Sequence, residues 1–288
     1  MVVEDFSLGG KKSLGDLPCL FCRARSSSIC SVLGNEEIKC LNDIVSRRSL
    51  AEGARLFEEG DNAVDYFVVT EGCLMVFKET YDGRRQITGF LYPGDMLGLN
   101  DRQHYVYTAE ALQDSILCQY PISELNGLFR DFPDMEHWML KHCSNELVSA
   151  HDQMFLLGRK NAAEKIATFL LLLLLRSQRQ LSETDSLELP MSRRDIADYL
   201  GLTVETVSRT ITRLRRDRII ETVGKDVIEI LDIQALRVRA CIGNDWAPAA
   251  LTCQAPHHSE REKYAEKGKD RASEAEHVVG SARDHEQS

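Results

Sequence analysis

The sequence has no hydrophobic run long enough to cross a membrane. Its longest apolar stretch, Ile166 to Leu175, has ten residues, whereas a helix rising 1.5 Å per residue needs about 20 to span a hydrocarbon core of ~30 Å. A secretion signal is also missing, because the stretch from Met1 to Pro18 mixes polar side chains with glycine. These absences predict a cytoplasmic protein with no membrane partner, in which thiols stay reduced.

Catalytic patterns are equally scarce. The sequence contains no glycine-rich loop that could cradle a phosphate, and its β-rich region carries no pair of carboxylates at telling positions. His104, His137 and His142 lack a Ser or Asp partner at catalytic spacing. The sequence therefore predicts a protein that is not an enzyme.

Composition and charge indicate a two-domain protein with one basic face. The 288 residues, 43% of them hydrophobic, can build two cores without disulfides. The formal net charge of -10 disfavours nucleic-acid binding over the whole surface. A local basic segment nevertheless predicts one DNA-contacting module. Its arginines are Arg193, Arg194, Arg209, Arg213, Arg215, Arg216 and Arg218.

The first half of the chain changes texture twice. A polar, cysteine-bearing leader passes into a short helix predicted over 35–47. From residue 50 to 120, short β-rich runs such as "YFVVT" and "CLMVF" alternate with glycines. Strands of this length with glycine turns predict an antiparallel β-roll of the jelly-roll type.

One long helix is predicted from residue 135 to about 159. Its apolar stripe is sparse, which suits pairing with a second copy of the chain, but packing on the chain's own β-roll explains the same periodicity. The leucines at 170–175 are apolar on every side and predict a buried core helix. The stripe consists of Leu140, Leu147, Val148, Met154 and Phe155.

The stretch "LPMSRRDIADYLGLTVETVSRTITRLRRDRII" (189–220) predicts a helix-turn-helix. Ser192 and Asp195 form a capping-box pattern that starts one helix, and Gly201 ends it. Thr203 then caps a second helix, whose predicted inward residues are Val204, Val207, Ile211 and Leu214. The two β-rich runs of "IIETVGKDVIEILD" around Gly224 and Lys225 predict the hairpin of a winged domain.

Three residues of the second helix share the face opposite its buried side. Glu205, Ser208 and Arg209 lie at positions i, i+3 and i+4. Arg209 has the fork that binds guanine O6 and N7, Glu205 can accept from cytosine N4, and Ser208 can satisfy a neighbouring base edge. The plain alternative is a solvated helix with a Glu205–Arg209 ion pair, worth ~0.3–0.5 kcal/mol. The arginines from 213 onward are expected on phosphates.

These signals define an α+β chain. It combines an N-terminal antiparallel β-roll, a long helix and a C-terminal winged helix-turn-helix. The predicted division is 1–46 for the cysteine-bearing leader and short helix, 47–131 for the β-roll sensor domain, 132–159 for the dimerisation helix, 160–243 for the DNA-binding domain, and 244–288 for a disordered, charged tail.

The chain resembles the Crp/Fnr superfamily of bacterial transcription regulators, and within it the oxygen-responsive Fnr type. The resemblance covers about residues 19–240 and lies in "LGLTVETVSRTITRL" (200–214), "GRRQITGFLYPGDMLGL" (83–99), "LFEEGD" (56–61) and the cysteine placement. It implies that Glu205, Ser208 and Arg209 read a site similar to TTGAT-N4-ATCAA as a homodimer. It also implies that the turn at 80–86 touches RNA polymerase.

Cyclic-nucleotide sensing is not expected. Members of the superfamily that bind cyclic nucleotides hold the phosphate with an Arg shortly after the "PGD" segment, and this sequence reads "NDRQHYVYTAEAL" there. Arg102 is offset from that place, and a buried phosphodiester without a cationic partner is costly.

Cys19, Cys22 and Cys30 can place three thiolates around one metal centre, because the x2 turn brings neighbouring sulfurs together and the x7 loop returns the chain. The resemblance implies that Cys118 is the distant fourth ligand and that the group is a 4Fe-4S cluster. The x7 spacing departs from the enterobacterial x5 and is similar to the rhizobial FnrN-like branch. Spacing alone leaves zinc, or a metal-free thiol switch, as alternatives.

The remaining cysteines and one histidine carry weaker expectations. Cys40, Cys73, Cys143 and Cys241 are expected to be small apolar residues, and Cys253 to be incidental in the tail. His151 lies in the stripe of the long helix, where the Fnr family tends to carry an acidic residue. It either repels its twin when protonated or is an exposed side chain without a role. The hypothesis is an anaerobic switch in which oxygen destroys the cluster and the dimer dissociates.

Overall fold

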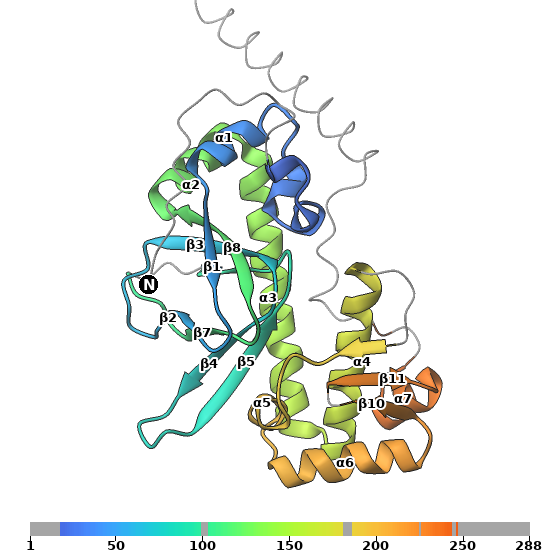
Figure 1. Cartoon of the computed structure of the whole chain (residues 1–288). Helices are drawn as coiled ribbons and strands as arrows, with labels where there is room; N and C mark the ends of the chain where they lie inside the picture. The colour runs from blue at the N-terminus through green and yellow to red at the C-terminus, as the bar shows by residue number, and fades with distance from the viewer. Residues whose placement is uncertain (1–17, 99–102, 181–185, 225, 244–245, 247–288) are drawn as a thin grey trace, which may run out of the picture. The chain divides into compact units, whose positions relative to one another are not determined.

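The computed structural model describes residues 18–98, 103–180, 186–224, 226–243 and 246. Except for Trp246, the tail expected over 244–288 lies outside these residues, Cys253 included. Arg102 lies outside them as well. No helix among the described residues is both long and apolar enough to cross a membrane. Figure 1 shows the β-roll, the long helix α3 that runs past it, and the helical C-terminal domain.

The β-roll consists of two antiparallel four-stranded sheets. One has the order β1-β8-β3-β6 and the other β2-β7-β4-β5. Glycine turns separate the strands, as the sequence predicted, so the expected α+β fold with its N-terminal roll is confirmed. The strands are β1 (Ser46–Leu50), β2 (Arg55–Phe57), β3 (Asp65–Glu71), β4 (Leu74–Glu79), β5 (Arg85–Leu91), β6 (Met96–Leu97), β7 (Thr108–Ala111) and β8 (Ser115–Pro121).

Aromatic and aliphatic side chains from both sheets fill the interior of the roll. The rings of Phe57 and Tyr105 stack at a centroid distance of 3.7 Å, and Phe67 and Tyr107 lie 5.9 and 5.7 Å from Phe57. The Tyr107 hydroxyl accepts a hydrogen bond from the Gly98 N–H at 3.0 Å. The interior of the roll is therefore a packed hydrophobic core.

Short helical turns cover one end of the roll. The leader folds into the 3-10 helices η2 (Pro18–Leu20), η3 (Arg23–Ser27) and η4 (Ile29–Val32), followed by α1 (Ile38–Ile44). After β8, α2 (Ile122–Asp131) leads into α3 (Pro133–Arg159). The helix predicted over 35–47 is shorter than expected because Ser46 already pairs with Gln119 in the ladder of β1 and β8.

The C-terminal domain is a winged helix-turn-helix. Its elements are α4 (Ala162–Gln180), β9 (Ser186–Glu188), α5 (Arg193–Leu200), α6 (Val204–Arg216), β10 (Ile220–Val223), β11 (Val227–Ile230) and α7 (Ile233–Arg239). The hairpin β10–β11 confirms the predicted wing. The sequence analysis missed β9, which extends the wing to the sheet order β10-β11-β9.

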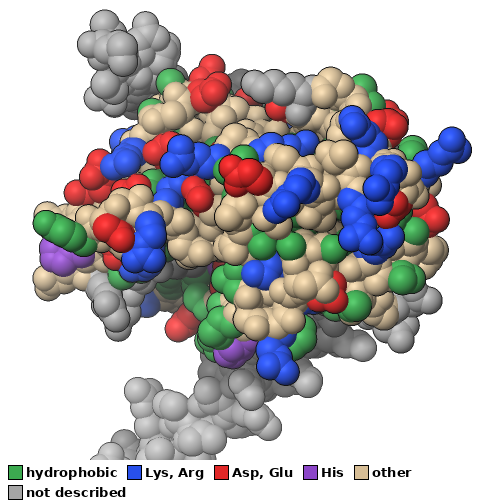
Figure 2. Space-filling model, turned by 90° about the horizontal axis from the view of Figure 1, so that it is seen from below, with side chains coloured by type: hydrophobic (Ala, Val, Ile, Leu, Met, Phe, Trp, Pro, Cys, Tyr) green, Lys and Arg blue, Asp and Glu red, His purple; other side chains and the backbone are tan. Residues whose placement is uncertain are grey.

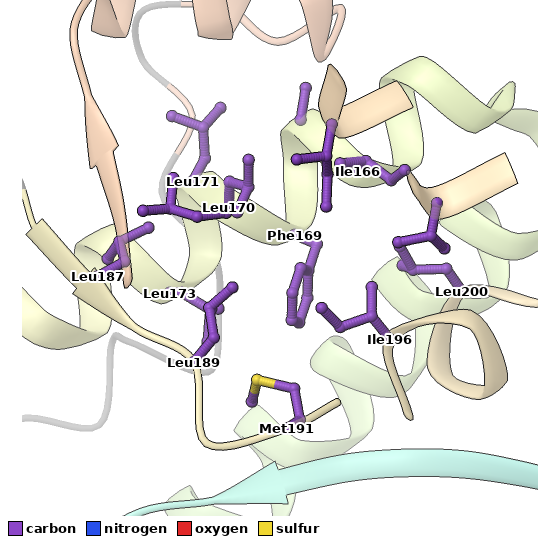
Figure 3. Close-up of a cluster of buried hydrophobic side chains, with 14 of the residues drawn as sticks. Ile166, Phe169, Leu170, Leu171, Leu173, Leu187, Leu189, Met191, Ile196 and Leu200 are labelled. Atoms are coloured by element: carbon purple, nitrogen blue, oxygen red, sulfur yellow. The ribbon is translucent and has the colours of Figure 1, made fainter. Parts of the chain in front are cut away.

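The leucine run of α4 forms the centre of this domain. Leu170, Leu171, Leu173 and Leu174 are buried, as predicted for a helix apolar on every side. Figure 3 shows Phe169 and its neighbours on α4 facing Leu189, Met191 and Ile196.

Local signals placed the two helices of the helix-turn-helix correctly. Ser192 and Asp195 form a reciprocal capping box, Gly201 ends α5 at φ 60°, and the Thr203 hydroxyl caps α6 through the Thr206 N–H. One of the four predicted inward residues of α6 is wrong, since Val204 is 38% exposed. It occupies the first helical position, where the turn has not yet reached the core. Val207, Ile211 and Leu214 are buried.

Candidate functional site

The structure brings all four predicted cysteine ligands to one cavity. Cys19 lies in η2, Cys22 precedes η3, and Cys30 lies in η4, whereas Cys118 is on β8. The cavity is small and opens to solvent. Cys22 is half-buried and the other three thiols are buried. The remaining lining residues are Ala24, Ser28, Arg47, Val68, Thr70 and Tyr120.

Cys118 is held on the central part of the first sheet. It pairs with Arg47 on β1 and with Val68 on β3, so strands flank it on both sides. The two lining residues Val68 and Arg47 are thus its ladder partners. This position is set by backbone hydrogen bonds and does not depend on the leader.

The leader reaches the cavity through its own hydrophobic anchors. Ile29 and Leu33 are almost fully buried and belong to a cluster that also holds Met135 and Trp138 of α3. The Arg25 guanidinium donates to the Leu33 carbonyl and to Asn35 Oδ1, both at 3.1 Å, which closes the loop between η3 and the end of η4. The x7 loop therefore returns the chain to the site by packing.

Burial makes these thiols weak acids. It raises the pKa of Cys19 to about 11 and that of Cys118 to about 12, and in both cases the neighbouring cysteines raise the pKa as well. Burial also raises the pKa of Cys30. Arg47 and Arg25 lower the pKa of Cys19, which only partly offsets these effects. Thiolates are therefore stable here when further positive charge enters the cavity.

Two polar groups contact the cavity sulfurs. Cys19 Sγ donates to Asn42 Oδ1 at 3.6 Å, and Cys30 Sγ lies 3.8 Å from the Tyr120 hydroxyl oxygen. No group of three or more His, Cys, Asp or Glu side chains in the described part of the chain is arranged to hold a metal ion. The four thiols thus line one cavity, but their sulfurs are not arranged to bind a single metal ion.

The prediction for the other cysteines is correct only in part. Cys73 is buried, as expected for a small apolar residue. Cys40, Cys143 and Cys241 are exposed, which contradicts the expectation. Cys40 faces solvent because the neighbouring positions Ile38 and Leu41 of α1 take the buried side.

The three predicted base readers lie together on the outer face of α6. Glu205, Ser208 and Arg209 are exposed, opposite the buried Val207 and Ile211. Hydrogen bonds from the Glu205 backbone N–H and the Thr203 hydroxyl, and then the charge of Arg209, hold the Glu205 pKa below its usual range. At neutral pH this face therefore presents a carboxylate, a hydroxyl and a guanidinium.

Further basic and hydroxyl groups surround this outer face of α6. A polar hollow lies between α6 and the wing. Figure 2 views the molecule from the side on which α6 lies in Figure 1, where Lys and Arg side chains are interspersed with Asp and Glu side chains. The arginines and hydroxyl groups that line the hollow suit a polyanion. The hollow is lined by Arg193, Ser208, Ile211, Thr212, Arg215, Thr222 and Gly224.

An ion pair that sequence reasoning missed joins β5 to α5. Arg85 donates to Asp195 at 2.5 Å and to Asp198 at 2.9 Å, and Gln86 donates to the Tyr199 carbonyl at 3.1 Å. The exposed turn predicted over 80–86 is therefore too wide, because Arg85 and Gln86 lie against α5. Tyr81 at its tip is fully exposed. The arginine gave no local signal, since its partners follow more than 100 residues later.

A second set of contacts links the leader to α4. Gly94 has a φ of 100°, and a Cβ there would overlap Ser27 at the end of η3. The adjacent Asp95 accepts from Arg176 Nη1 of α4 at 2.7 Å. Ser27 lies between Cys22 and Cys30 in sequence, so a single turn touches both the cysteine site and the C-terminal domain.

The apolar stripe of α3 faces away from the subunit. Leu140, Leu147 and Met154 follow one another at seven-residue spacing and are 59–70% exposed, and Val148 and Phe155 lie beside them. The opposite face carries the buried Met135, Trp138 and His142. His151 is exposed within the stripe. Heptad spacing of exposed apolar residues is the pattern of a helix that pairs with another helix.

Comparison with known proteins agrees with this architecture. A family model described as the Crp-like helix-turn-helix domain matches residues 164–239, and one described as the cyclic nucleotide-binding domain matches residues 47–132. The nitrogen fixation regulation protein FixK of Bradyrhizobium diazoefficiens is 37% identical over 76% of this chain and 93% of its own length. The chain belongs to the Crp/Fnr family of transcription regulators.

Other Crp/Fnr proteins give the same result. The transcriptional activator protein FnrA of Stutzerimonas stutzeri is 37% identical over 74% of this chain and 88% of its own. The structure of FixK2 from Bradyrhizobium japonicum is 35% identical, with a TM-score of 0.64, and the match covers 68% of this chain and 96% of that one. The structure of a CooA mutant from Carboxydothermus hydrogenoformans shares the fold at 21% identity and a TM-score of 0.56 over 69% of this chain and 88% of that one.

Membership of the Crp/Fnr family establishes the general activity. The protein is a DNA-binding transcription activator of this type, its helix-turn-helix implies DNA binding, and the family structure implies a dimer. Its relatives are transcription regulators, so the prediction that it is not an enzyme is confirmed.

Proposed function

We propose that this Crp/Fnr protein is a cytoplasmic oxygen-responsive regulator whose Cys19, Cys22, Cys30 and Cys118 bind a 4Fe-4S cluster. The convergence of four thiols from two distant parts of the chain on one cavity carries the proposal. Four cysteine thiolates are the usual donor set of such a cluster, and each binds its own iron, so the sulfurs are spaced around a group instead of a point. The buried thiols fit a positively charged inorganic centre.

The bound cluster supplies a centre that oxygen can destroy. The residues of the chain connect the leader to the sheet. Cys118 is fixed in the sheet, so its thiolate, together with the three of the leader, ties η2–η4 to β8. Release of that tie leaves the leader held by packing contacts, among them those of Ile29, Val32 and Leu33.

The leader and α3 share a hydrophobic cluster, which connects the cysteines to dimer formation. Cys19, Cys30 and Cys118 lie in the same cluster as Met135 and Trp138, the buried residues of the first turns of α3. Loss of the leader's packing loosens this end of α3 and disfavours the geometry in which two helices pair through Leu147 and Met154. A monomer contacts only one half-site, so its DNA affinity falls steeply.

The decisive experiment compares protein isolated with and without air. Anaerobic protein is expected to be brown, to absorb at roughly 400 nm and to contain about four iron and four sulfide per chain. Air is expected to bleach it and to release it from a TTGAT-N4-ATCAA duplex. Colourless protein that contains stoichiometric zinc and binds DNA equally in air would instead establish the zinc alternative. A metal-free thiol switch is the less suitable alternative, because oxidation-prone thiols are low-pKa thiolates.

Cyclic nucleotides are not proposed as effectors, although the roll matches the cyclic nucleotide-binding domain model. The stacked rings of Phe57 and Tyr105 occupy the interior of the roll, and the partly buried Tyr107 packs against them at a tilt. Thr108, the hydroxyl residue in this region, already accepts a hydrogen bond from the Glu59 N–H at 3.1 Å.

The exposed tip of the β4–β5 hairpin is proposed as a contact for RNA polymerase. Tyr81 projects fully into solvent, and the Thr80 hydroxyl accepts the Arg84 N–H at 3.2 Å, so the turn that carries Tyr81 is braced. A rigid turn loses little entropy when it binds a partner.

Arg209 is proposed to read the guanine of the half-site. Arg209→Ala is expected to weaken binding to the TTGAT duplex tenfold to a hundredfold, since a bidentate Arg–guanine pair is worth about 1–3 kcal/mol. Anaerobic fluorescence anisotropy on duplexes with and without that G·C pair measures it. The wild type should lose affinity when the pair is replaced, whereas the variant should not distinguish the two duplexes.

Arg216→Ala on the same helix is the matched control. Its side chain is 75% exposed and lies two turns further along α6. A phosphate contact carries no sequence information, so this variant should weaken both duplexes alike and reduce the salt dependence by about one ion. Equal losses on both duplexes for Arg209→Ala would show that Arg209 also binds only the backbone.

A further inference from the structure

The phenol of Tyr120 forms part of the wall of the cysteine cavity. Tyr120 lies two residues after Cys118 on β8, so both side chains leave the strand on the same face. Among the described residues it is the largest fully buried side chain, with 1% of its surface exposed, and its hydroxyl oxygen lies 3.8 Å from Cys30 Sγ. One side chain of the sheet therefore reaches the third cysteine of the leader.

Burial raises the pKa of the Cys118 thiol, and Tyr120 is a group that lowers it. Burial also raises the pKa of Cys30, which Ser28 and then Tyr120 lower. The phenol thus lies between the leader and the strand that the proposed cluster would join. A phenylalanine would fill the same space without a buried hydroxyl, and a buried hydroxyl needs a hydrogen-bond partner. The Cys30 sulfur is the partner that the structure gives it.

The geometry points to Tyr120 as a positioning residue that donates a hydrogen bond to the ligand sulfurs, chiefly that of Cys30, and thereby slows their oxidative release. This inference rests on the proposed cluster. A ligand thiolate has no proton, so the phenol must be the donor. Hydrogen bonds to ligand sulfurs withdraw electron density and raise the reduction potential of iron-sulfur centres.

The step that Tyr120 slows is a one-electron oxidation by dissolved dioxygen. A cluster held by Cys19, Cys22, Cys30 and Cys118 would supply the one electron that dioxygen takes up to leave as superoxide. The phenol gives up neither its proton nor an electron, because it acts only through the hydrogen bond. A higher reduction potential makes the transfer of this electron to dioxygen slower.

Tyr120→Phe tests the inference, since it removes one oxygen atom and keeps the ring. Anaerobically isolated Tyr120→Phe is expected to contain as much iron and sulfide as the wild type and to bleach in air about threefold to tenfold faster. Its midpoint potential, measured by anaerobic titration, should be lower than that of the wild type. Equal bleaching rates and equal potentials would overturn the inference.

Tyr105→Phe is the matched control. Tyr105 is buried in the same roll, but its hydroxyl donates to the Asp65 carbonyl at 2.9 Å, away from the cysteines. It should bleach at the wild-type rate. Loss of the cluster from Tyr120→Phe during anaerobic isolation, while Tyr105→Phe keeps its cluster, would overturn the inference, because no dioxygen is present there to oxidise the cluster.

The outcome separates this inference from the proposed function. Wild-type protein without iron and sulfide would refute the cluster and the role of Tyr120 together. Brown wild-type protein whose bleaching rate and potential match those of Tyr120→Phe would refute only the role of Tyr120.

Discussion

Cys118→Ser is expected to emerge from anaerobic purification without iron, without sulfide and without absorption at roughly 400 nm. Serine is a poor ligand for iron compared with a thiolate, and the three leader cysteines cannot replace a ligand fixed on β8. The variant should remain monomeric and bind the TTGAT-N4-ATCAA duplex more than a hundredfold more weakly than the anaerobic wild type. Metal analysis, sedimentation velocity and anisotropy under nitrogen measure the three effects.

Cys73→Ser is the control for this variant. Cys73 is also buried in the β-roll, and burial raises the pKa of its thiol to about 12, but it does not line the cysteine cavity. The same chemical change there should reduce stability without removing the cluster. Wild-type iron and sulfide in Cys118→Ser would show that the leader cysteines hold the metal alone, and the four-ligand proposal would then be wrong.

Leu147→Glu is expected to convert the anaerobic dimer to a monomer and to weaken operator binding more than a hundredfold. Leu147 is 59% exposed in the subunit and lies at the middle of the heptad stripe of α3. Two-fold symmetry places the new carboxylate opposite its own copy and removes two leucines from the interface. A combined loss of about 3 kcal/mol corresponds to more than two factors of ten. Sedimentation under nitrogen and anisotropy measure it.

The colour of Leu147→Glu distinguishes its cause from that of Cys118→Ser. Its cysteine cavity is untouched, so the variant should be brown and monomeric, whereas Cys118→Ser should be colourless and monomeric. Val64→Glu, which adds the same charge at a position that is 62% exposed and outside α3, should stay dimeric. A brown, dimeric Leu147→Glu protein would show that the subunits pair through another surface.

The two linkages between the β-roll and the C-terminal domain bear on how a change at the cysteines could reach the reading helix. Asp195 both caps α5 and accepts from Arg85, so the start of the helix-turn-helix is bound to β5. Asp95 binds Arg176 beside the turn on which Ser27 of the leader packs. Both pairs are partly buried, so removing one partner of either pair is costly.

The sequence by itself determined the elements whose signals are local. The capping box of Ser192 and Asp195, the left-handed Gly201 and the Thr203 cap fix the helix-turn-helix through contacts within a few residues of each other. The face of Glu205, Ser208 and Arg209 follows from helical periodicity alone. Even in this helix the predicted burial of Val204 was wrong, because the exposure of the first helical residue depends on which elements lie beside it.

The cysteine cavity required the fold. Spacing could bring Cys19, Cys22 and Cys30 together, but resemblance alone gave Cys118 its role, and nothing local indicated that Tyr120 and Arg47 would share the cavity with it. The exposure of Cys40 and Cys143 was not predicted either, because free cysteines are usually buried and only the packing of each helix shows that these positions are left uncovered.

Short-range hydrogen bonds and side-chain periodicity depend on neighbouring residues. The sequence alone therefore predicted helix α6 and the β-roll that precedes it. Contacts between residues a hundred positions apart, such as Arg85 with Asp198 or Cys30 with Tyr120, depend on how sheets and helices pack. Only the tertiary structure decided which groups surround the four sulfurs and which face of α3 is left open for a partner. Burial is a property of the assembled chain, not of any segment of it.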